Sequence, residues 1–206
     1  APVTRYVFAT GLWNAYRHLE TEVLLEAITD SRFMTGMIAG RIQSLQRLPI
    51  DQGAEELAEL SHSLYPSEAW DAPFAKTLLK DPEAMRFTRT RLERRAESIV
   101  LDSIGALGAV KAKEAIEGLL AIAADKTNRS ELVRDRVIWA LGEIAATDHN
   151  VEDSMVKIAI DNQESIYNRA QAIRVLRSNG SAKAEEGIRQ AIALDDRLTT
   201  ILPQKP

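Results

Sequence analysis

Three segments in the second half of the chain repeat one pattern of small and large apolar residues. They are Leu101–Gly108 (LDSIGALG), Asp135–Gly142 (DRVIWALG) and, more loosely, Ala170–Arg177 (AQAIRVLR). The leucines Leu107, Leu141 and Leu176 are 34 and 35 residues apart. A fixed period of this length is typical of stacked helical pairs, in which each unit buries its apolar face against the next. The repeat therefore predicts an all-α chain built as an α-α superhelix.

The spacing of apolar residues and the positions of turn formers divide the whole chain into helices. We expect helices over about residues 3–28, 31–48, 53–64, 74–80, 82–108, 112–124, 130–146, 151–160, 165–178 and 182–194. The proline-flanked stretch 65–72 is the expected linker. The organisation that follows is a helical region over residues 1–80, a repeat array over residues 81–198 and a flexible tail over residues 199–206. The first region is either a cap or a set of degenerate repeats.

Local signals give some of these helices a start, a buried face or a close neighbour. Asp81-Pro82 predicts a helix start, because Asp caps the free amides and Pro suits the first turn. Met85, Leu92, Ala96, Ile99 and Ser103 then line one face of that helix. The small residues Ala106, Gly108, Ala140 and Gly142 are expected to let neighbouring helices approach closely, and the Gly36–Gly40 spacing predicts the same near the N-terminus.

The second helices of the pairs also align. Each ends in an aspartate, and Asp125, Asp161 and Asp195 occupy matching places, 36 and 34 residues apart. Aspartate at a helix end favours a turn, because its carboxylate accepts hydrogen bonds from nearby backbone amides. We therefore interpret these residues as loop-capping groups and not as a catalytic set.

The middle repeat carries a recognisable motif. Val133–Ile144 (VRDRVIWALGEI) resembles the V-R-x-x-A-x-x-A-L-G-x-I pattern of HEAT-like repeats, of the variety first described in phycobilisome lyase subunits. The third repeat keeps the arginine as Arg169 but loses the Leu-Gly pair, and the first repeat has Val100 in place of the arginine. The resemblance covers residues 95–195. It implies a HEAT-like solenoid in which Arg134 and Arg169 tie neighbouring repeats together through acidic or carbonyl partners.

Composition limits the possible chemistry. The 206-residue chain contains no cysteine, which excludes disulfides, thiolate zinc sites and cysteine nucleophiles. Its net charge of −4 disfavours nucleic-acid binding. The three histidines lie on different elements without a His-Glu-x-x-His motif, and no glycine-rich phosphate loop occurs, so we expect no metal, no cofactor and no enzyme activity. No apolar run is long enough to span a membrane. Since no signal-peptide pattern is present, a soluble protein is expected, in the cytoplasm in preference to export.

The most concentrated charge feature is a run of five arginines, Arg86, Arg89, Arg91, Arg94 and Arg95. One interpretation is a local anion-binding patch for a phosphate, a carboxylate or an acidic partner. The other is a solvated helix face whose charges are balanced by Glu83, Glu93 and Glu97.

Trp139 is the most informative single residue. It points roughly opposite the buried stripe of its helix, and the aligned positions hold Gly105 and Arg174, so the repeat itself does not require an aromatic there. An outward-facing tryptophan is a natural anchor for a partner. The alternative is that the ring fills a gap in the packing. The candidate partner-binding residues are therefore Arg86, Arg91, Arg94, Arg95, Trp139 and Arg174.

The function expected from these features is a non-enzymatic scaffold or adaptor that binds another protein, in a hetero- or homo-oligomer. The resemblance implies one alternative, a bilin lyase or chaperone-like subunit that acts on a phycobiliprotein and its bilin chromophore. A DNA glycosylase built on HEAT-like repeats is a further alternative. It is disfavoured by the acidic balance and by the lack of a long basic stripe.

Overall fold

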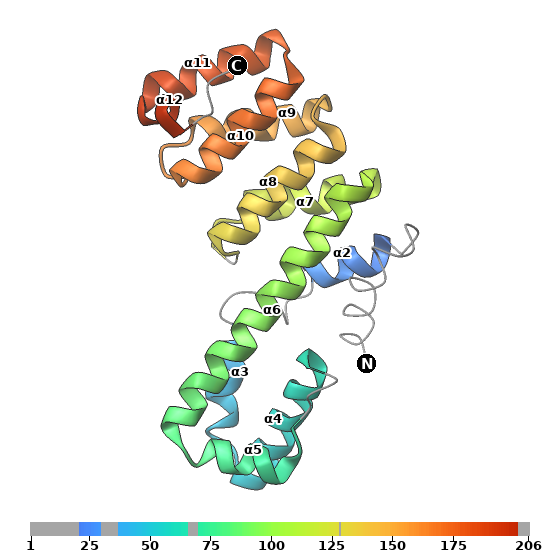
Figure 1. The fold of residues 1–206 in the computed structure, drawn as a ribbon, viewed down its shortest axis with the longest axis vertical. Coiled ribbons are helices and arrows are strands. Elements are labelled where there is room, and N and C mark those ends of the chain that lie inside the picture. The colour runs from blue at the N-terminus through green and yellow to red at the C-terminus, as the bar shows by residue number, and fades with distance from the viewer. Residues whose placement is uncertain (1–20, 30–36, 66–69, 128, 202–206) are drawn as a thin grey trace. The chain divides into compact units, whose positions relative to one another are not determined.

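The computed structural model of the protein consists of helices joined by turns (Figure 1). It describes residues 21–29, 37–65, 70–127 and 129–201, with the backbone alone for residues 21–23. These residues contain no β-strand, so the expected all-α class is confirmed. The chain forms two compact units, unit 1 over Ala1–Ser103 and unit 2 over Ile104–Pro206, which divide within one long helix.

The described residues of unit 1 form four helices and most of a fifth. They are α2 (Thr21–Thr29), α3 (Met37–Leu45), α4 (Ile50–Leu64), α5 (Ala72–Leu79) and α6 (Pro82–Val110). Helix α4 packs against both α3 and α5. Helix α2 is the described part of the helix expected over residues 3–28, of which residues 3–20 lie outside the described residues. Helix α3 ends at Leu45, three residues before the expected end at residue 48, because residues 46–48 form a turn, and the expected residues 31–36 lie outside the described residues. Helices α4 and α5 begin two to three residues earlier than expected.

Helix α6 follows the sequence expectation closely. Asp81 Oδ1 accepts hydrogen bonds from the backbone amides of Glu83 and Ala84, at 2.9 and 3.2 Å, which satisfies the otherwise free amides of the first turn. Pro82 occupies the first helical position. The predicted inward face is fully confirmed, since all of its members are buried: Met85, Leu92, Ala96, Ile99 and Ser103.

Unit 2 contains the end of α6 and six further helices. They are α7 (Ile116–Ala124, preceded by a 3-10 turn at Lys113–Ala115), α8 (Glu131–Ala145), α9 (His149–Ile160), α10 (Ile166–Asn179), α11 (Ala182–Leu194) and α12 (Arg197–Ile201). Serines cap three of them. The Oγ atoms of Ser130, Ser165 and Ser181 accept hydrogen bonds from backbone amides three residues further on, at 3.0–3.2 Å.

The helices of unit 2 are arranged as pairs that contact one another in order. Helix α8 packs against α10, while α9 packs against α11 and also contacts α7. In addition, α7 contacts α8, α9 contacts α10, and α10 contacts α11 (Figure 1). The buried side chains between them include the three repeat leucines Leu107, Leu141 and Leu176, so the core forms where the sequence repeat predicts it.

Glycines allow neighbouring helices to approach where the sequence indicates. A Cβ atom at Gly108 would lie 2.8 Å from Cζ3 of Trp139 and 3.1 Å from the Cα of Ala140. A Cβ atom at Gly142 would lie 2.6 Å from Cγ2 of Val175. The expected close approach is therefore confirmed at Gly108 and Gly142.

The end of the described chain differs from the expected tail. Residues 199–201 belong to α12, which contacts α10 and α11. Leu198 is completely buried, so one leucine anchors a helix of only five residues. The part of the expected tail over residues 202–206 lies outside the described residues.

Two glycines on α6 provide a matched test of helix approach. Gly108→Ala should destabilise unit 2 by about 1–3 kcal/mol, because the new methyl group meets backbone that cannot move aside freely. Gly105→Ala should instead stabilise the protein by about 0.5–1 kcal/mol, because a Cβ there meets no described atom within 4 Å and alanine favours the helix. Thermal unfolding followed by circular dichroism measures both. Equal effects of the two substitutions would contradict the close approach at Gly108.

Candidate binding surfaces

Arg134, the arginine of the middle repeat motif, is buried and forms hydrogen bonds through all three of its guanidinium nitrogens. Nε and Nη2 of Arg134 on α8 donate to the carbonyl oxygen of Ala123, at 3.1 and 2.9 Å, in the last turn of α7. Its Nη1 donates to Glu164 Oε1 at 2.7 Å, and its Nη2 also contacts Oε2 of that carboxylate. Glu164 lies in the loop before α10. A single side chain therefore joins the end of α7 to the loop that leads into the next repeat.

Arg169 repeats this arrangement one unit later. Its Nε donates to the carbonyl oxygen of Ala159 in the last turn of α9, at 3.0 Å. Its Nη1 donates to Asp195 Oδ2 at 3.1 Å, and its Nη2 to the carbonyl oxygen of Ala191 at 3.4 Å. Arg134 and Arg169 are thus structural, as the resemblance implies, and they are not available to a ligand. We call the two contact sets the arginine clamps.

The recurring aspartates cap the loops as expected. Oδ1 of Asp125, Asp161 and Asp195 each accepts a hydrogen bond from the backbone amide two residues further on, at 2.9–3.2 Å. Asp161 also forms an ion pair with Lys126, and Asp195 with Arg197 at 2.7 Å. These aspartates therefore stabilise the loops that connect successive pairs.

The acids of the clamps have lowered pKa values. Burial alone would raise the pKa of Glu164, but hydrogen bonds from Arg134 and Asn168 outweigh it and hold the pKa below its ordinary value. The hydrogen bond from Arg197 lowers the pKa of Asp195 to about 2, and the charge of Arg169 adds to this effect. Both carboxylates are therefore ionised at neutral pH.

Trp139 is half-buried, and its ring serves as a packing contact on one side. Its Cζ3 atom lies against Gly108 on α6, while the guanidinium of Arg136 lies 5.4 Å from the ring centroid. The glycine that the repeat motif places at position 108 leaves room for this ring. The remaining exposed part of Trp139 faces the same side of α8 as Arg136.

The outer face of α8 and α10 displays two large apolar side chains that the sequence analysis did not single out. Leu132 is 54% exposed and Tyr167 is 67% exposed. They are 35 residues apart, in the first turn of α8 and of α10, so they hold equivalent positions in successive repeats. Reading the repeat for its outward positions, as well as its inward ones, would have revealed them. Arg174 is also exposed here and donates to Gln171 Oε1 at 2.9 Å. We call the exposed side chains Leu132, Arg136, Tyr167 and Arg174 the outer face.

Asp135 lies between the arginines of this outer face. Burial raises its pKa, and the positive charges of Arg136 and Arg174 partly oppose that increase. The influence of Arg174 on α10 indicates that the side chains of the two helices act on one another. The outer face is therefore one connected surface with charges of both signs.

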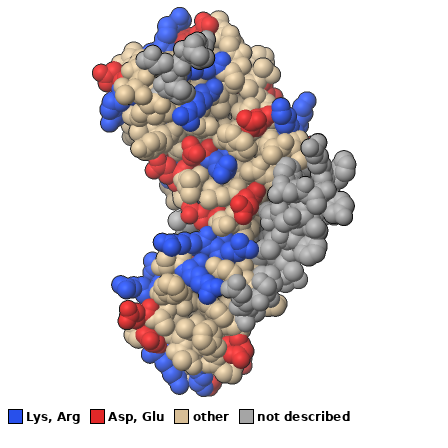
Figure 2. Space-filling model, viewed as in Figure 1, with Lys and Arg blue, Asp and Glu red and all other residues tan. Residues whose placement is uncertain are grey.

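The arginine run of α6 lies in unit 1 and is divided between two roles. Figure 2 shows basic side chains gathered over the middle of α6. The guanidinium of Arg91 lies 4.8 Å from the ring centroid of Tyr65 and 6.0 Å from that of Trp70. Arg95 lies 5.6 Å from the Tyr65 ring and donates to the carbonyl oxygen of Leu64 at 3.2 Å. These two candidates are therefore engaged in holding α4 to α6.

The other arginines of the run face solvent. Arg89 pairs with Glu93 at 3.1 Å, as expected for a balanced helix face. Arg86 and Arg94 are exposed, and their guanidinium groups have no ion pair or hydrogen bond with any residue that the structure describes. The sequence could not distinguish these arginines from Arg91 and Arg95, because the aromatic partners come from a distant segment.

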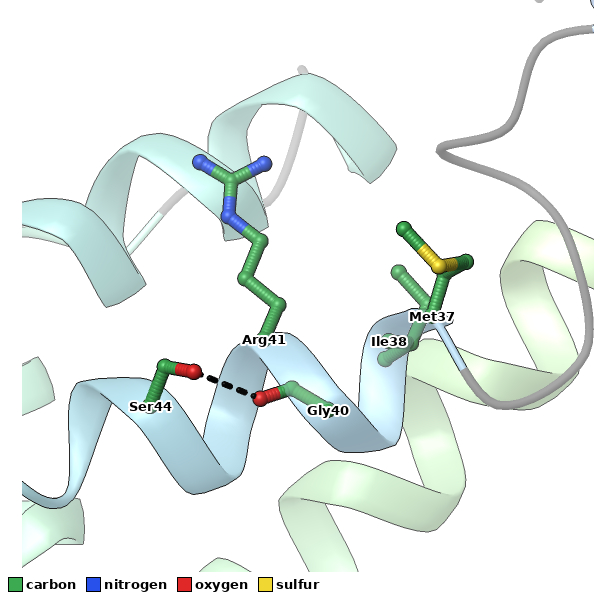
Figure 3. Close-up of a pocket in the computed structure, with 5 residues that line it drawn as sticks. All are labelled: Met37, Ile38, Gly40, Arg41 and Ser44. Carbon is green, nitrogen blue, oxygen red and sulfur yellow. Dashed lines mark hydrogen bonds between the residues drawn. The ribbon is translucent and has the colours of Figure 1, made fainter.

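A hollow of about 420 Å³ lies beside α3 (Figure 3). Its lining is Met37, Ile38, Gly40, Arg41 and Ser44. Of the expected Gly36–Gly40 pair, Gly36 lies outside the described residues, and a Cβ atom at Gly40 would meet no described atom within 4 Å, so the structure shows no close helix packing at Gly40. The Ser44 hydroxyl donates back to the Gly40 carbonyl oxygen at 3.0 Å, so it does not face a ligand. This hollow offers few directed polar groups.

The described parts of the chain contain neither a membrane-spanning helix nor a metal site. No helix there is long and apolar enough to cross a membrane. No group of three or more histidine, aspartate or glutamate side chains in those parts could hold a metal ion. Comparisons with protein-family models, with curated proteins and with solved structures found no match to this chain.

Loss of a clamp arginine should lower the free energy of unfolding substantially. Arg134→Ala leaves the Glu164 carboxylate buried without its partner, so we expect a loss of about 3–5 kcal/mol in the free energy of unfolding. Arg136→Ala on the same helix removes an exposed charge and one cation–π contact, and should cost about 1 kcal/mol or less. Urea unfolding of the two variants measures the difference. Similar losses for both would mean that the clamp does not stabilise the stack.

The Asp195 pair makes unit 2 sensitive to acid. The folded pKa of about 2 lies below the unfolded value of 3.8, so the stabilisation is fully present above pH about 4 and is lost as the pH falls towards 2. Arg197→Ala should raise the pKa of Asp195 and move acid unfolding to a higher pH. Carboxyl titration by carbon NMR checks the first effect and circular dichroism the second. Arg189→Ala is the control for the titration, because Arg189 pairs with Glu186 within α11 and its loss should raise the pKa of Glu186 and not that of Asp195.

Proposed function

We propose that this chain is a non-enzymatic scaffold that binds another protein along the outer face of α8 and α10, within a HEAT-like repeat array. The observation that carries the proposal is the repetition of the arginine clamp. Arg134 and Arg169 make the same kind of contact, each with the end of the preceding helix and with an acid further along the chain. Such recurrence is what stacked repeats require, because each unit is stable only against its neighbours.

The clamps also distinguish the buried residues that hold the helices together from the exposed residues that can bind a partner. The buried positions of α8 and α10 are occupied by packing residues and by the clamp arginines. The outward positions are exposed, and they hold Leu132, Tyr167 and Arg174. Repeat arrays in general use such extended faces to bind partners.

The chemistry of the outer face suits a protein partner. Aromatic and arginine side chains dominate the binding energy of many protein interfaces, because they bury a large area and still form polar contacts. Here Tyr167 and Leu132 offer apolar contacts, while Arg136 and Arg174 offer charged hydrogen-bond donors. We expect the partner to be a different protein or a second copy of this chain.

Substitutions on the outer face and on α11 test this proposal. The chain is used as bait with extract from its native source, and the affinity of the retained partner is then measured for three forms. Tyr167→Ala/Arg174→Ala should weaken binding by about 2 kcal/mol or more, roughly thirtyfold in Kd. The matched control is Leu194→Ala/Arg189→Ala, which removes an exposed apolar residue and an exposed arginine from α11.

The control is expected to leave the affinity unchanged. If both double variants weaken the complex equally, or if only the α11 variant does, the outer face is not the binding surface. If only the chain itself is retained, sedimentation of the same variants shows whether the outer face joins two copies.

A further inference from the structure

From unit 1 we infer that the exposed side of α6 binds an acidic segment of a protein, with Arg86 and Arg94 as charged contacts and Phe87 as the apolar contact. This surface is independent of the outer face of unit 2. The inference goes beyond the proposed scaffold and does not depend on it.

The three side chains lie on the solvent side of α6. Phe87 and Arg94 are seven residues apart, which is two helical turns, and Arg86 directly precedes Phe87. The opposite side of the helix is the buried face that contains Leu92 and Ile99. The three residues are therefore directed away from the core of unit 1.

Their exposure is not explained by a structural role. Phe87 is 72% exposed, the highest value among the exposed large apolar side chains of the described residues. The guanidinium groups of Arg86 and Arg94 have no hydrogen bond or ion pair with a described residue, in contrast to Arg91 and Arg95, which are held against Tyr65. An exposed phenylalanine that contributes nothing to the fold is a cost to solubility.

The local charge identifies the partner. Over residues 82–97 the helix carries five arginines against three glutamates, although the whole chain has a net charge of −4. The complementary ligand is therefore anionic, and the planar guanidinium matches a carboxylate with two parallel hydrogen bonds. Two unpaired arginines suit a short acidic segment with an apolar residue. Nucleic acid requires a longer basic track, because its affinity comes from many phosphate contacts.

A defined peptide tests the inference. The probe is a fluorescein-labelled peptide in which glutamate alternates with leucine and phenylalanine, and its binding to the full chain is followed by anisotropy at low salt. Arg86→Ala/Arg94→Ala should weaken binding by at least about tenfold, and Phe87→Ala by about fivefold. The matched control is Arg41→Ala/Arg47→Ala, which removes two exposed arginines of unit 1 and gives the same net charge.

A charge exchange gives a second test that does not rely on loss of binding. Arg86→Glu/Arg94→Glu should bind the corresponding peptide with lysine in place of glutamate, and should no longer bind the original one. Circular dichroism confirms that each variant is folded.

Three results would overturn the inference. They are no binding of the acidic peptide by the wild-type chain, equal weakening by the control pair, and preferential binding of single-stranded oligothymidine over the peptide. The last result would assign the surface to nucleic acid instead.

Discussion

The stack of helices in unit 2 depends on burying two arginines at the ends of other helices. The last carbonyl groups of a helix have no partner within it, and a guanidinium can satisfy them because it carries five donors in a fixed plane. Arg134 contacts the end of α7, and Arg169 contacts the end of α9. In each case a carboxylate compensates the buried charge. The arginine, the helix end and the carboxylate come from successive elements. Each clamp therefore fixes the spacing of the helix pairs and also stabilises them. Replacement by apolar residues can equal such a pair in stability, but it leaves the carbonyl groups at the helix ends without these hydrogen bonds.

The first repeat shows what happens when one member of the clamp is absent. Val100 stands where the second and third repeats have Arg134 and Arg169. The residue before the capping Ser130 is Arg129, whereas the residue before the equivalent Ser165 is the clamp acid Glu164. An acid at position 129 would have no clamp arginine in the first repeat to balance its charge. The first repeat therefore lacks both the clamp arginine and the clamp acid. Arg129 is itself largely buried, and burial lowers its pKa while the charge of Asp125 opposes that effect.

The features that the sequence predicts well are those set by local interactions. The start of α6 at Asp81-Pro82 needs only residues within one turn, and the inward stripe needs only helical spacing. The capping role of Asp125, Asp161 and Asp195 is equally local. The approaches at Gly108 and Gly142 join distant residues, and it is the sequence repeat that indicates them. The HEAT-like superhelix itself and the roles of the candidate binding residues remain predictions.

The contacts that the sequence could not specify join residues distant in the chain. Glu164 is 30 residues from Arg134, and nothing nearby marks it as the acid of a clamp. The same is true of Tyr65, which holds Arg91 and Arg95 and so divides the arginine run in a way that spacing alone cannot show. Gly40 illustrates the converse, because its GxxxG spacing indicates close packing, yet a Cβ atom there would meet no described atom within 4 Å.

The difference between Arg134 and Arg136 explains why this architecture determines so little about its ligand. The two arginines are two residues apart on α8, yet one is buried in a clamp and the other is exposed beside Trp139. Inward positions repeat from pair to pair because they must satisfy the same helix ends and fill the same space. Exposed positions differ, as Leu132 and Tyr167 do at equivalent sites, because their side chains contribute little to the packing between helices. Partner specificity is therefore expected to reside in the residues that break the repeat and not in those that define it.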